Sequence, residues 1–133
     1  MENKHVYQAY DVRITDDNEV IAIVEPDSYL KELVEDKSEC WELDMDVEFD
    51  EEEKELYLVI NLYKKNGEIH ILLPYGEAWD ALIEKGTLTI ALLTEYDLEF
   101  KDLSDAILLT VEINEFYQGF IVGAERTWEE ITD

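Results

Sequence analysis

Carboxylates recur at every second position near the middle of this chain, with a hydrophobic residue in each gap. These acids are Glu42, Asp44, Asp46, Glu48 and Asp50. Because carboxylates bind cations, the row has two chemical uses: it can coordinate a metal ion, or it can pair with Lys and Arg on another protein. Residues two apart on a strand are separated by about 6.7 Å, close to the ~6.8 Å covered by two base steps of DNA. Such a row could therefore occupy basic pockets built for a phosphate backbone.

The spacing also matches part of a calcium-binding EF-hand loop. Asp44, Asp46, Glu48, Asp50 and Glu55 correspond to positions 1, 3, 5, 7 and 12 of that loop. Position 6, which requires Gly for the sharp turn, is Phe49. The alternating hydrophobic residues predict a strand, which points the acids outward in a line rather than around an ion. We therefore expect no metal site and no cofactor.

The predicted partner-binding residues are the strand acids, the acids of the turn that follows, and a second, shorter row. The full set is Glu42, Asp44, Asp46, Glu48, Asp50, Glu51, Glu52, Glu53, Glu95, Asp97 and Glu99. Residues 35–55 contain 12 acids but only two lysines. A charged outer face also protects a sheet edge from aggregation, which explains the alternation. Lys would protect an edge equally well, so its scarcity favours binding.

Side chains suited to catalysis are scarce. His5 lies near a chain end, and His70 alternates with isoleucines on a predicted hairpin strand. Cys40 lies near Glu39 and Glu42, whose charges disfavour a reactive thiolate. The sequence has neither a GxGxxG pattern nor a Walker A loop. We expect no catalytic residues, so the sequence predicts that the protein is not an enzyme.

Acidic residues outnumber basic ones by 35 to 10, which gives a net charge of −25. Disordered acidic chains lack aliphatic and aromatic side chains, but this chain is 47% hydrophobic and 11% aromatic, so we expect it to fold. Solubility alone needs a net charge of only about 2–8 in a small domain, and nothing else indicates adaptation to high salt. The charge excludes direct binding to nucleic acid, because phosphate sites need Lys and Arg. It favours a basic protein partner.

Cysteine content and hydrophobic runs predict the location. A single cysteine, Cys40, cannot form an internal disulfide and fits a reducing compartment. The first residues lack the apolar segment of a signal peptide, and apolar runs such as residues 69–73 are too short to span a bilayer. Anionic lipid would repel an acidic surface. We expect a cytoplasmic protein with no membrane partner.

Alternation dominates the hydrophobic pattern, so the sequence predicts more strands than helices. Strands are expected over residues 6–14, 20–24, 41–49, 56–63, 68–73, 88–100 (one bent strand or two), 107–113 and 117–122. Helices are expected over residues 28–36, with Ser28 as N-cap, and 77–85, with Gly86 as the stop. Residues 125–131 are a possible short terminal helix, and Asn66-Gly67 predicts a type I′ hairpin turn.

No repeat or linker divides the sequence, so residues 1–133 are expected to form a single acidic domain. The simplest architecture is α+β: a mainly antiparallel sheet of about 7–8 strands, with two short helices on one side. An all-β sandwich or barrel is the alternative.

Together these features predict an acidic inhibitor that covers a basic, nucleic-acid-binding surface of a partner enzyme or nuclease. By charge and size alone, the description fits DNA mimics, phage anti-restriction and anti-CRISPR proteins, and immunity proteins against nuclease toxins. Charge would steer association, with Trp41, Trp79, Trp128 and surface tyrosines as candidate anchors, because aromatic side chains dominate interface hot spots. Each Trp has the core as its alternative position, and the core is the preferred position for Trp41. The alternative is a non-catalytic adaptor or phage accessory subunit, whose contact is an apolar patch and whose acidity only keeps it soluble. The oligomeric state stays open.

Overall fold

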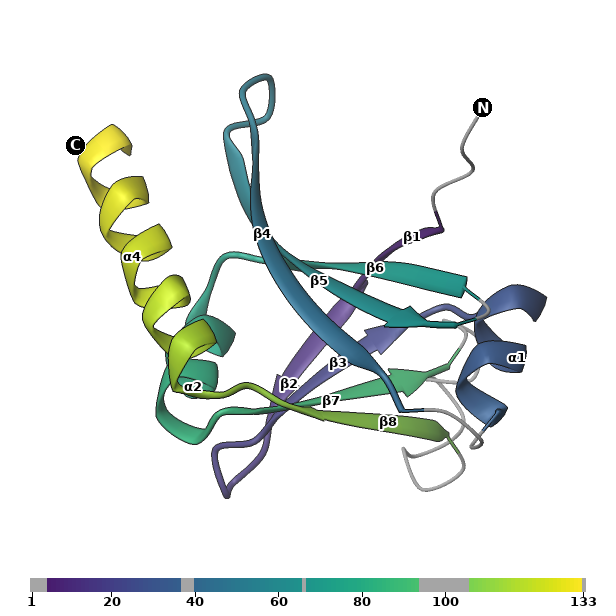
Figure 1. Cartoon of the computed structure of the whole chain (residues 1–133). Helices are drawn as coiled ribbons and strands as arrows, with labels where there is room; N and C mark the ends of the chain where they lie inside the picture. Colours follow the sequence, from purple (N-terminus) through teal and green to yellow (C-terminus); the bar gives the residue numbers. More distant parts are fainter. Residues whose placement is uncertain (1–4, 37–39, 66, 94–105, 133) are drawn as a thin grey trace.

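The computed structural model describes residues 5–36, 40–65, 67–93 and 106–132. These residues form eight strands and three helices, which confirms the predicted α+β class. The strands make two four-stranded sheets that share one core, with one helix at one end and two at the other (Figure 1). The sequence predicted one sheet, because alternation reports which strands exist but not how they divide between sheets.

The first sheet carries the predicted acidic strand at its edge. Its order is β1 (Val6–Gln8), β6 (Gly67–Pro74), β5 (Glu55–Lys64) and β4 (Glu42–Asp50). β4, β5 and β6 are antiparallel neighbours, whereas β1 runs parallel to β6. Lys64 pairs with Gly67, which confirms the β5–β6 hairpin. The type I′ turn predicted at Asn66-Gly67 is wrong at Gly67, which is already the first residue of β6 and lacks the positive φ that this turn requires. Asn66 lies outside the described residues.

The second sheet closes the other side of the core. Its order is β2 (Asp11–Ile14), β3 (Val20–Val24), β7 (Thr87–Leu92) and β8 (Ile107–Glu112). β3 and β7 are parallel, and the other two pairs are antiparallel. A long strand was expected over residues 88–100. Residues 88–92 lie in β7, and residues 94–100 lie outside the described part.

The single strand expected over residues 6–14 is wrong, because the chain passes from one sheet to the other. The N–H of Ala9 donates to Leu72 O in the first sheet at 3.1 Å. The next N–H, from Tyr10, donates to Ile23 O in the second sheet at 3.0 Å. Hydrophobic residues at even positions (Val6, Tyr10, Val12 and Ile14) continue across this crossing in the sequence, but the side chains packed on the main core are Tyr7 and Ala9 before it and Val12 after it. Periodicity therefore could not locate the break.

The strand expected over residues 117–122 is also wrong, because these residues lie within helix α4 (Glu115–Thr132). Asn114 caps this helix: its Oδ1 accepts a hydrogen bond from Tyr117 N at 3.1 Å. Tyr117, Ile121 and Trp128 then pack against the core at helical spacing. The predicted terminal helix over residues 125–131 is the second half of α4. Gly119 and the β-branched residues near it favoured the strand prediction.

The other two helices follow the prediction closely. In α1 (Ser28–Glu35), Asp27 and not Ser28 is the N-cap, and its Oδ1 accepts from Leu30 N at 2.9 Å. The α2 helix (Glu77–Lys85) ends at Gly86, which adopts the left-handed conformation with φ of 70°. Gly86 then brings α2 against the start of α4, because Ile113 N donates to Gly86 O at 2.7 Å.

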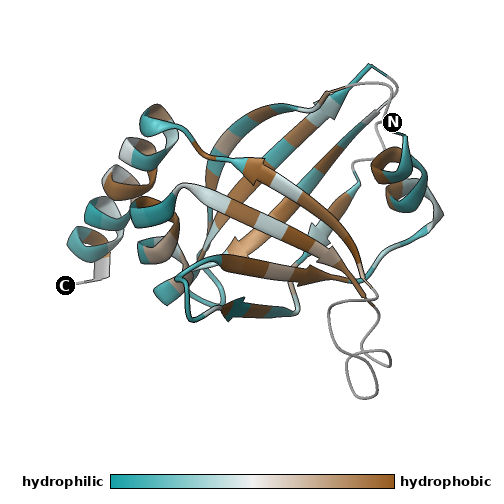
Figure 2. Ribbon diagram, turned by 90° about the horizontal axis from the view of Figure 1, so that it is seen from below, coloured by the Kyte–Doolittle hydropathy of each residue, from teal (hydrophilic) through white to brown (hydrophobic). Residues whose placement is uncertain are grey.

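The core lies between the facing sheets. Leu58, Ile60 and Leu62 of β5 are fully buried, as are Leu88 and Ile90 of β7. In Figure 2, hydrophobic and hydrophilic positions alternate along the strands, as expected for sheets with one buried face. No helix in the described ranges is long and apolar enough to cross a membrane.

Candidate partner-binding site

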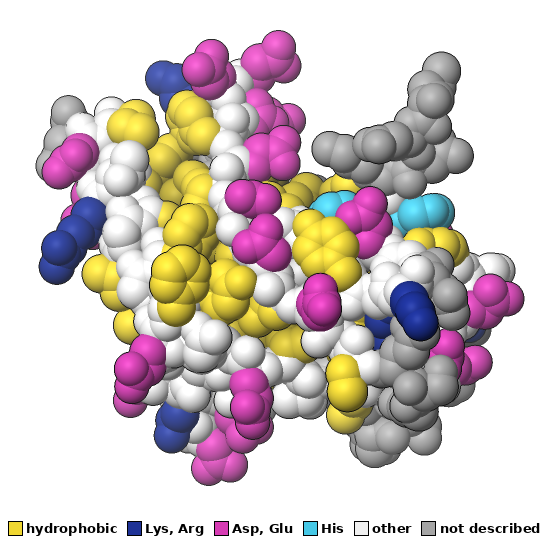
Figure 3. Space-filling view, in the orientation of Figure 1, with side chains coloured by type: hydrophobic (Ala, Val, Ile, Leu, Met, Phe, Trp, Pro, Cys, Tyr) yellow, Lys and Arg dark blue, Asp and Glu magenta, His cyan; other side chains and the backbone are white. Residues whose placement is uncertain are grey.

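β4 presents its even-numbered side chains on the outer face of the first sheet. We call Glu42, Asp44, Asp46, Glu48 and Asp50 the β4 acid row. The first four are exposed and Asp50 is half-buried. β5 places Tyr63, Asn61, Val59, Tyr57 and Glu55 opposite them. Figure 3 shows acidic side chains gathered along this projecting hairpin. The structure therefore brings these five predicted residues into one line.

The turn between β4 and β5 extends the row. Glu51, Glu52 and Glu53 are exposed at its tip. The Asp50 Oδ1 accepts hydrogen bonds from the N–H groups of Glu52 and Glu53, at 3.0 and 3.2 Å. This arrangement stabilises the turn through its own first residue. The three predicted tip acids therefore lie on a hydrogen-bonded turn.

The negative charge of the β4 acid row is uncompensated within the described ranges. No Lys or Arg described there forms an ion pair with it; ion pairs elsewhere join Arg13 to Asp11 and His70 to Glu68. Lys64 lies on the neighbouring strand, but its Nζ donates to the carbonyl oxygen of Leu33 at 2.6 Å. The row is therefore available to cations from outside the molecule.

A polar network fixes the middle of the row. Asn61 Nδ2 donates to Asp46 Oδ2 at 3.0 Å, so Asn61 Oδ1 faces His70 and accepts from its Nδ1. Asn61 is 3% exposed. A buried amide with partners on both sides has one favourable orientation. The network therefore orders Asp46 before any partner binds.

His70 is the described group with the most catalytic character. Its Nε2 is buried without a hydrogen-bond partner, and Glu68 Oε2, at 3.7 Å, is too distant to accept. A depression of about 540 Å³ over this face gathers His70, Asp46 and Glu68. The Glu68 side chain is half exposed and Asp46 is exposed, whereas active sites commonly desolvate their acids. The absence of catalytic residues stays a prediction.

Two tyrosines beside the row have raised pKa values. The hydrogen bond to Glu55, together with burial, raises the pKa of Tyr57 to about 12. Burial raises the pKa of Tyr63, and the charges of Asp44 and Glu68 raise it further. Both phenols therefore stay protonated at neutral pH. The Tyr57 hydroxyl already donates its proton to Glu55 Oε2.

An apolar groove lies on the other face of the hairpin, between β4 and α4. We call it the hairpin groove. It has a volume of about 640 Å³, and its lining includes Val47, Phe49, Phe120, Ala124 and Trp128. Figure 3 shows hydrophobic side chains at the surface beside the hairpin. The groove and the β4 acid row thus occupy opposite faces of one strand.

The groove corrects one expectation about residues 41–49. Their odd-numbered face was predicted to be buried, which is confirmed at Met45 but wrong at Val47 and Phe49, each 37% exposed. The hairpin projects past the sheets, and α4 diverges from it (Figure 1). No second layer therefore covers the end of this face in the described structure. Alternation shows that two faces differ, but not whether the apolar face is covered.

The three candidate tryptophan anchors have different positions. Trp79 is fully buried, and its Nε1 donates to Pro74 O at 3.1 Å, so its prediction as a surface anchor is wrong. Trp41 is half-buried beneath the Lys64 ammonium, which lies 4.5 Å from the ring centroid. Trp128 lines the hairpin groove with its ring edge-on to Phe49, at a centroid distance of 5.1 Å. Trp128 is the anchor candidate that the structure favours.

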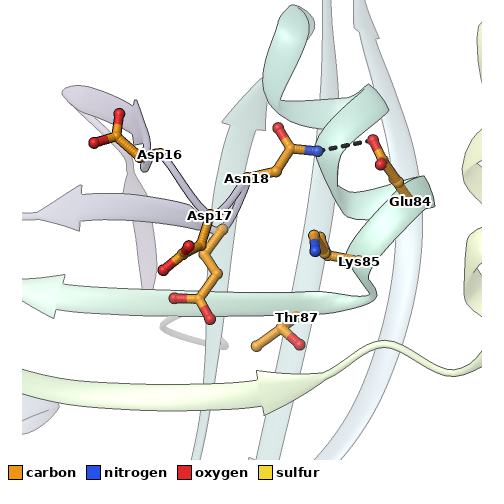
Figure 4. Close-up of a pocket in the computed structure, with 7 residues that line it drawn as sticks. Asp16, Asp17, Asn18, Glu84, Lys85 and Thr87 are labelled. Atoms are coloured by element: carbon orange, nitrogen blue, oxygen red, sulfur yellow. Dashed lines mark hydrogen bonds between the residues drawn. The ribbon is translucent and has the colours of Figure 1, made fainter.

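A second acidic depression lies away from the hairpin (Figure 4). It is an open space of about 850 Å³ between the β2–β3 turn and α2, lined by residues that include Asp16, Asp17 and Lys85. Asn18 Nδ2 donates to Glu84 Oε2 across it at 2.8 Å. Within the described ranges, no three His, Cys, Asp or Glu side chains group as metal ligands.

The second predicted row, Glu95, Asp97 and Glu99, lies outside the described residues. Of the groove residues of α4, Trp128 was a candidate anchor, whereas Phe120 and Ala124 were missed, because residues 117–122 were assigned to a strand. Helical spacing was present in the sequence: Phe120, Ala124 and Trp128 recur every four residues. Comparisons with protein families, with curated proteins and with solved structures found no match for this chain.

Proposed function

We propose that this chain is a cytoplasmic inhibitor whose β4 acid row covers a basic surface of a partner protein. The partner surface is one that otherwise binds nucleic acid, as in a nuclease or another nucleic-acid-binding enzyme. The chain would act by occupying that surface rather than by catalysis. The observation that carries this proposal is the β4 acid row itself: five carboxylates in line on one strand, without a described Lys or Arg in an ion pair with them.

Three physical features support this function. A net charge of −25 attracts a basic surface over several ångströms and raises the association rate. The strand spaces its carboxylates by about 6.7 Å, close to the ~6.8 Å that two base steps of DNA advance along the helix axis. The hydrogen bonds at Asp46 and Asp50 reduce the entropy lost when the row is ordered on a partner.

Competition with nucleic acid tests the proposal directly. The chain would be used to capture its partner from lysate of its own host at about 0.05 M salt, where exposed charges are weakly screened. The captured protein would then be titrated with labelled double-stranded DNA or RNA, with and without the chain. We expect the chain to displace the nucleic acid in proportion to its occupancy. Simultaneous binding of both would contradict the proposal.

The hairpin groove favours a second candidate, a non-catalytic adaptor or phage accessory subunit bound through apolar contacts. Val47 and Phe49 expose apolar surface that a folded monomer usually covers. Such a complex would survive at about 0.5 M salt, because apolar contacts are not screened. Partner binding that is unchanged between low and high salt would favour the adaptor over the inhibitor.

A further inference from the structure

The free edge of β4 has backbone groups available for another strand. In an antiparallel pair, alternate residues direct both N–H and C=O either toward the neighbour or away from it. Leu43 directs its carbonyl away from β5, because that oxygen accepts a hydrogen bond from the Tyr117 hydroxyl at 2.8 Å. Val47 and Phe49 share the parity of Leu43, so their backbone groups also point away from β5. The described structure gives these groups no backbone partner.

The two faces that meet at this edge have opposite character. Asp46 and Glu48 face outward as part of the β4 acid row. Val47 and Phe49 face inward toward the hairpin groove and Trp128. A strand added to the edge would place its alternate side chains beside each of these sets, because cross-strand neighbours lie about 4.5–5.5 Å apart. The edge therefore favours an added strand whose side chains alternate between those that suit the acids and those that suit the apolar groove.

We propose that the free edge of β4 pairs with an extended segment of the basic partner. The segment carries Lys or Arg at alternate positions, opposite the β4 acid row, and apolar side chains between them that enter the hairpin groove. The basic character of the segment rests on the proposed function. The pairing itself rests on the edge, the groove and the Tyr117 contact. Backbone hydrogen bonds would supply affinity and the alternating side chains specificity, as in other cases of strand addition.

Other occupants fit this edge less well. A second copy of the chain would place two β4 acid rows side by side, and like charges opposite one another on a sheet are unfavourable. Each copy carries a net charge of −25, which adds to the repulsion. A helix in the hairpin groove would cover the edge without pairing its N–H and C=O groups, which is costly for buried polar groups.

A peptide of alternating Lys and Val, about ten residues long, is a suitable probe. Amide hydrogen exchange would be followed by NMR on the full chain, with and without the peptide. We expect the Val47 and Phe49 amides to gain at least about tenfold protection, whereas Asp46 and Glu48, which already face β5, change little. No added protection at Val47 and Phe49 would overturn the proposal. Protection by a matched Glu/Val peptide would also contradict it.

Val47→Pro tests the backbone contact. Proline removes the outward N–H and is tolerated on an edge strand whose N–H faces solvent. V47A removes the same groove side chain but keeps the N–H, so we expect V47P to bind the peptide at least about tenfold more weakly than V47A does. Thermal unfolding would verify that both variants fold. Equal affinities for V47P and V47A would overturn the pairing.

A pair of glycine variants tests the groove without altering β4. Gly119 and Gly123 both lie on α4, and a Cβ at either position meets nothing within 4 Å. Gly123 lines the hairpin groove and Gly119 does not. We expect Gly123→Phe to weaken binding of the Lys/Val peptide at least fivefold, and Gly119→Phe to leave it unchanged. Equal effects would contradict entry of apolar side chains into the groove.

The triple variant D44N/D46N/E48Q separates this inference from the proposed function. Peptide binding lost in D44N/D46N/E48Q but intact in V47P would refute strand pairing and leave the charge-based inhibitor standing. Binding lost in V47P but intact in D44N/D46N/E48Q would support pairing and contradict the acidic function. Self-association of the chain alone through β4, detected by sedimentation, would show that a second copy occupies the edge and would overturn the proposal.

Discussion

Single residues differ in how firmly the structure holds them within the acidic surface. Asp46 is hydrogen-bonded to Asn61, and Asp50 caps the turn that follows it. Glu48 lies between them on the same exposed face. Carboxylates held in this way lose little freedom on binding, which makes a row of them a better ligand for a basic surface than scattered acids.

Glu125 gives a prediction at the residue scale. Burial, followed by the charge of Asp80 and a hydrogen bond with it, raises the pKa of Glu125 from 4.5 to about 7. The folded chain therefore binds the Glu125 proton more tightly than the unfolded chain does. The stabilisation that this proton gives the folded chain is complete below pH 4.5 and is lost as pH rises through about 7. We expect Glu125→Gln to be more stable than the wild type at pH 8, by about 1 kcal/mol after solvent screening. The difference should shrink toward zero at pH 5.

Urea unfolding of both proteins between pH 5 and pH 8 measures this difference. A gap between E125Q and the wild type that does not change with pH would show that Glu125 titrates alike in the folded and unfolded chain.

Secondary-structure elements show what the sequence could and could not predict. Period-two alternation located β4 and β6 closely, whereas β5, which is covered on both faces over much of its length, was placed as the hydrophobic run between two turns. The same signal could not reveal the crossing at Ala9 and Tyr10, which depends on the strand partners on either side. It also missed the first half of α4, where Gly119 opposed the capping signal of Asn114. The acid row was therefore predictable, but the groove beside it was not.

Gly86 gives a prediction at the element scale, because it ends α2 and accepts a hydrogen bond from Ile113, just before α4. Its φ is 70°, and a Cβ there would lie 2.8 Å from Ile113 O and 2.8 Å from Gln118 Nε2. We expect Gly86→Ala to lower the free energy of unfolding by about 1–3 kcal/mol, measured by urea denaturation. The matched variant Gly119→Ala lies in an open helical position and should raise it, by up to about 1 kcal/mol. Equal effects would show that the junction does not depend on Gly86.

At the scale of the whole molecule, charge and stability oppose each other. A net charge of −25 destabilises the compact state by self-repulsion, while the shared core between the sheets stabilises it. A protein that only had to remain dissolved would need far less charge. The proposed recognition of a basic surface would account for the excess.

Salt should affect folding and binding in opposite directions. We expect the thermal unfolding midpoint to rise between about 0.02 M and about 0.5 M NaCl, because screening relieves repulsion among the carboxylates. D44N/D46N/E48Q should unfold at a temperature equal to or above that of the wild type at low salt, and its midpoint should rise less. A midpoint that falls with salt would contradict the role assigned to self-repulsion.

The affinity of the captured partner for two charge-matched variants tests the central claim most directly. D44N/D46N/E48Q neutralises the β4 acid row, and D16N/D17N/E19Q removes the same charge from exposed positions near the β2–β3 turn. At about 0.05 M salt, we expect the first variant to bind at least tenfold more weakly and with a shallower salt dependence. The second should stay within about threefold of the wild type. Equal losses in both variants would show that net charge, and not the β4 acid row, attracts the partner.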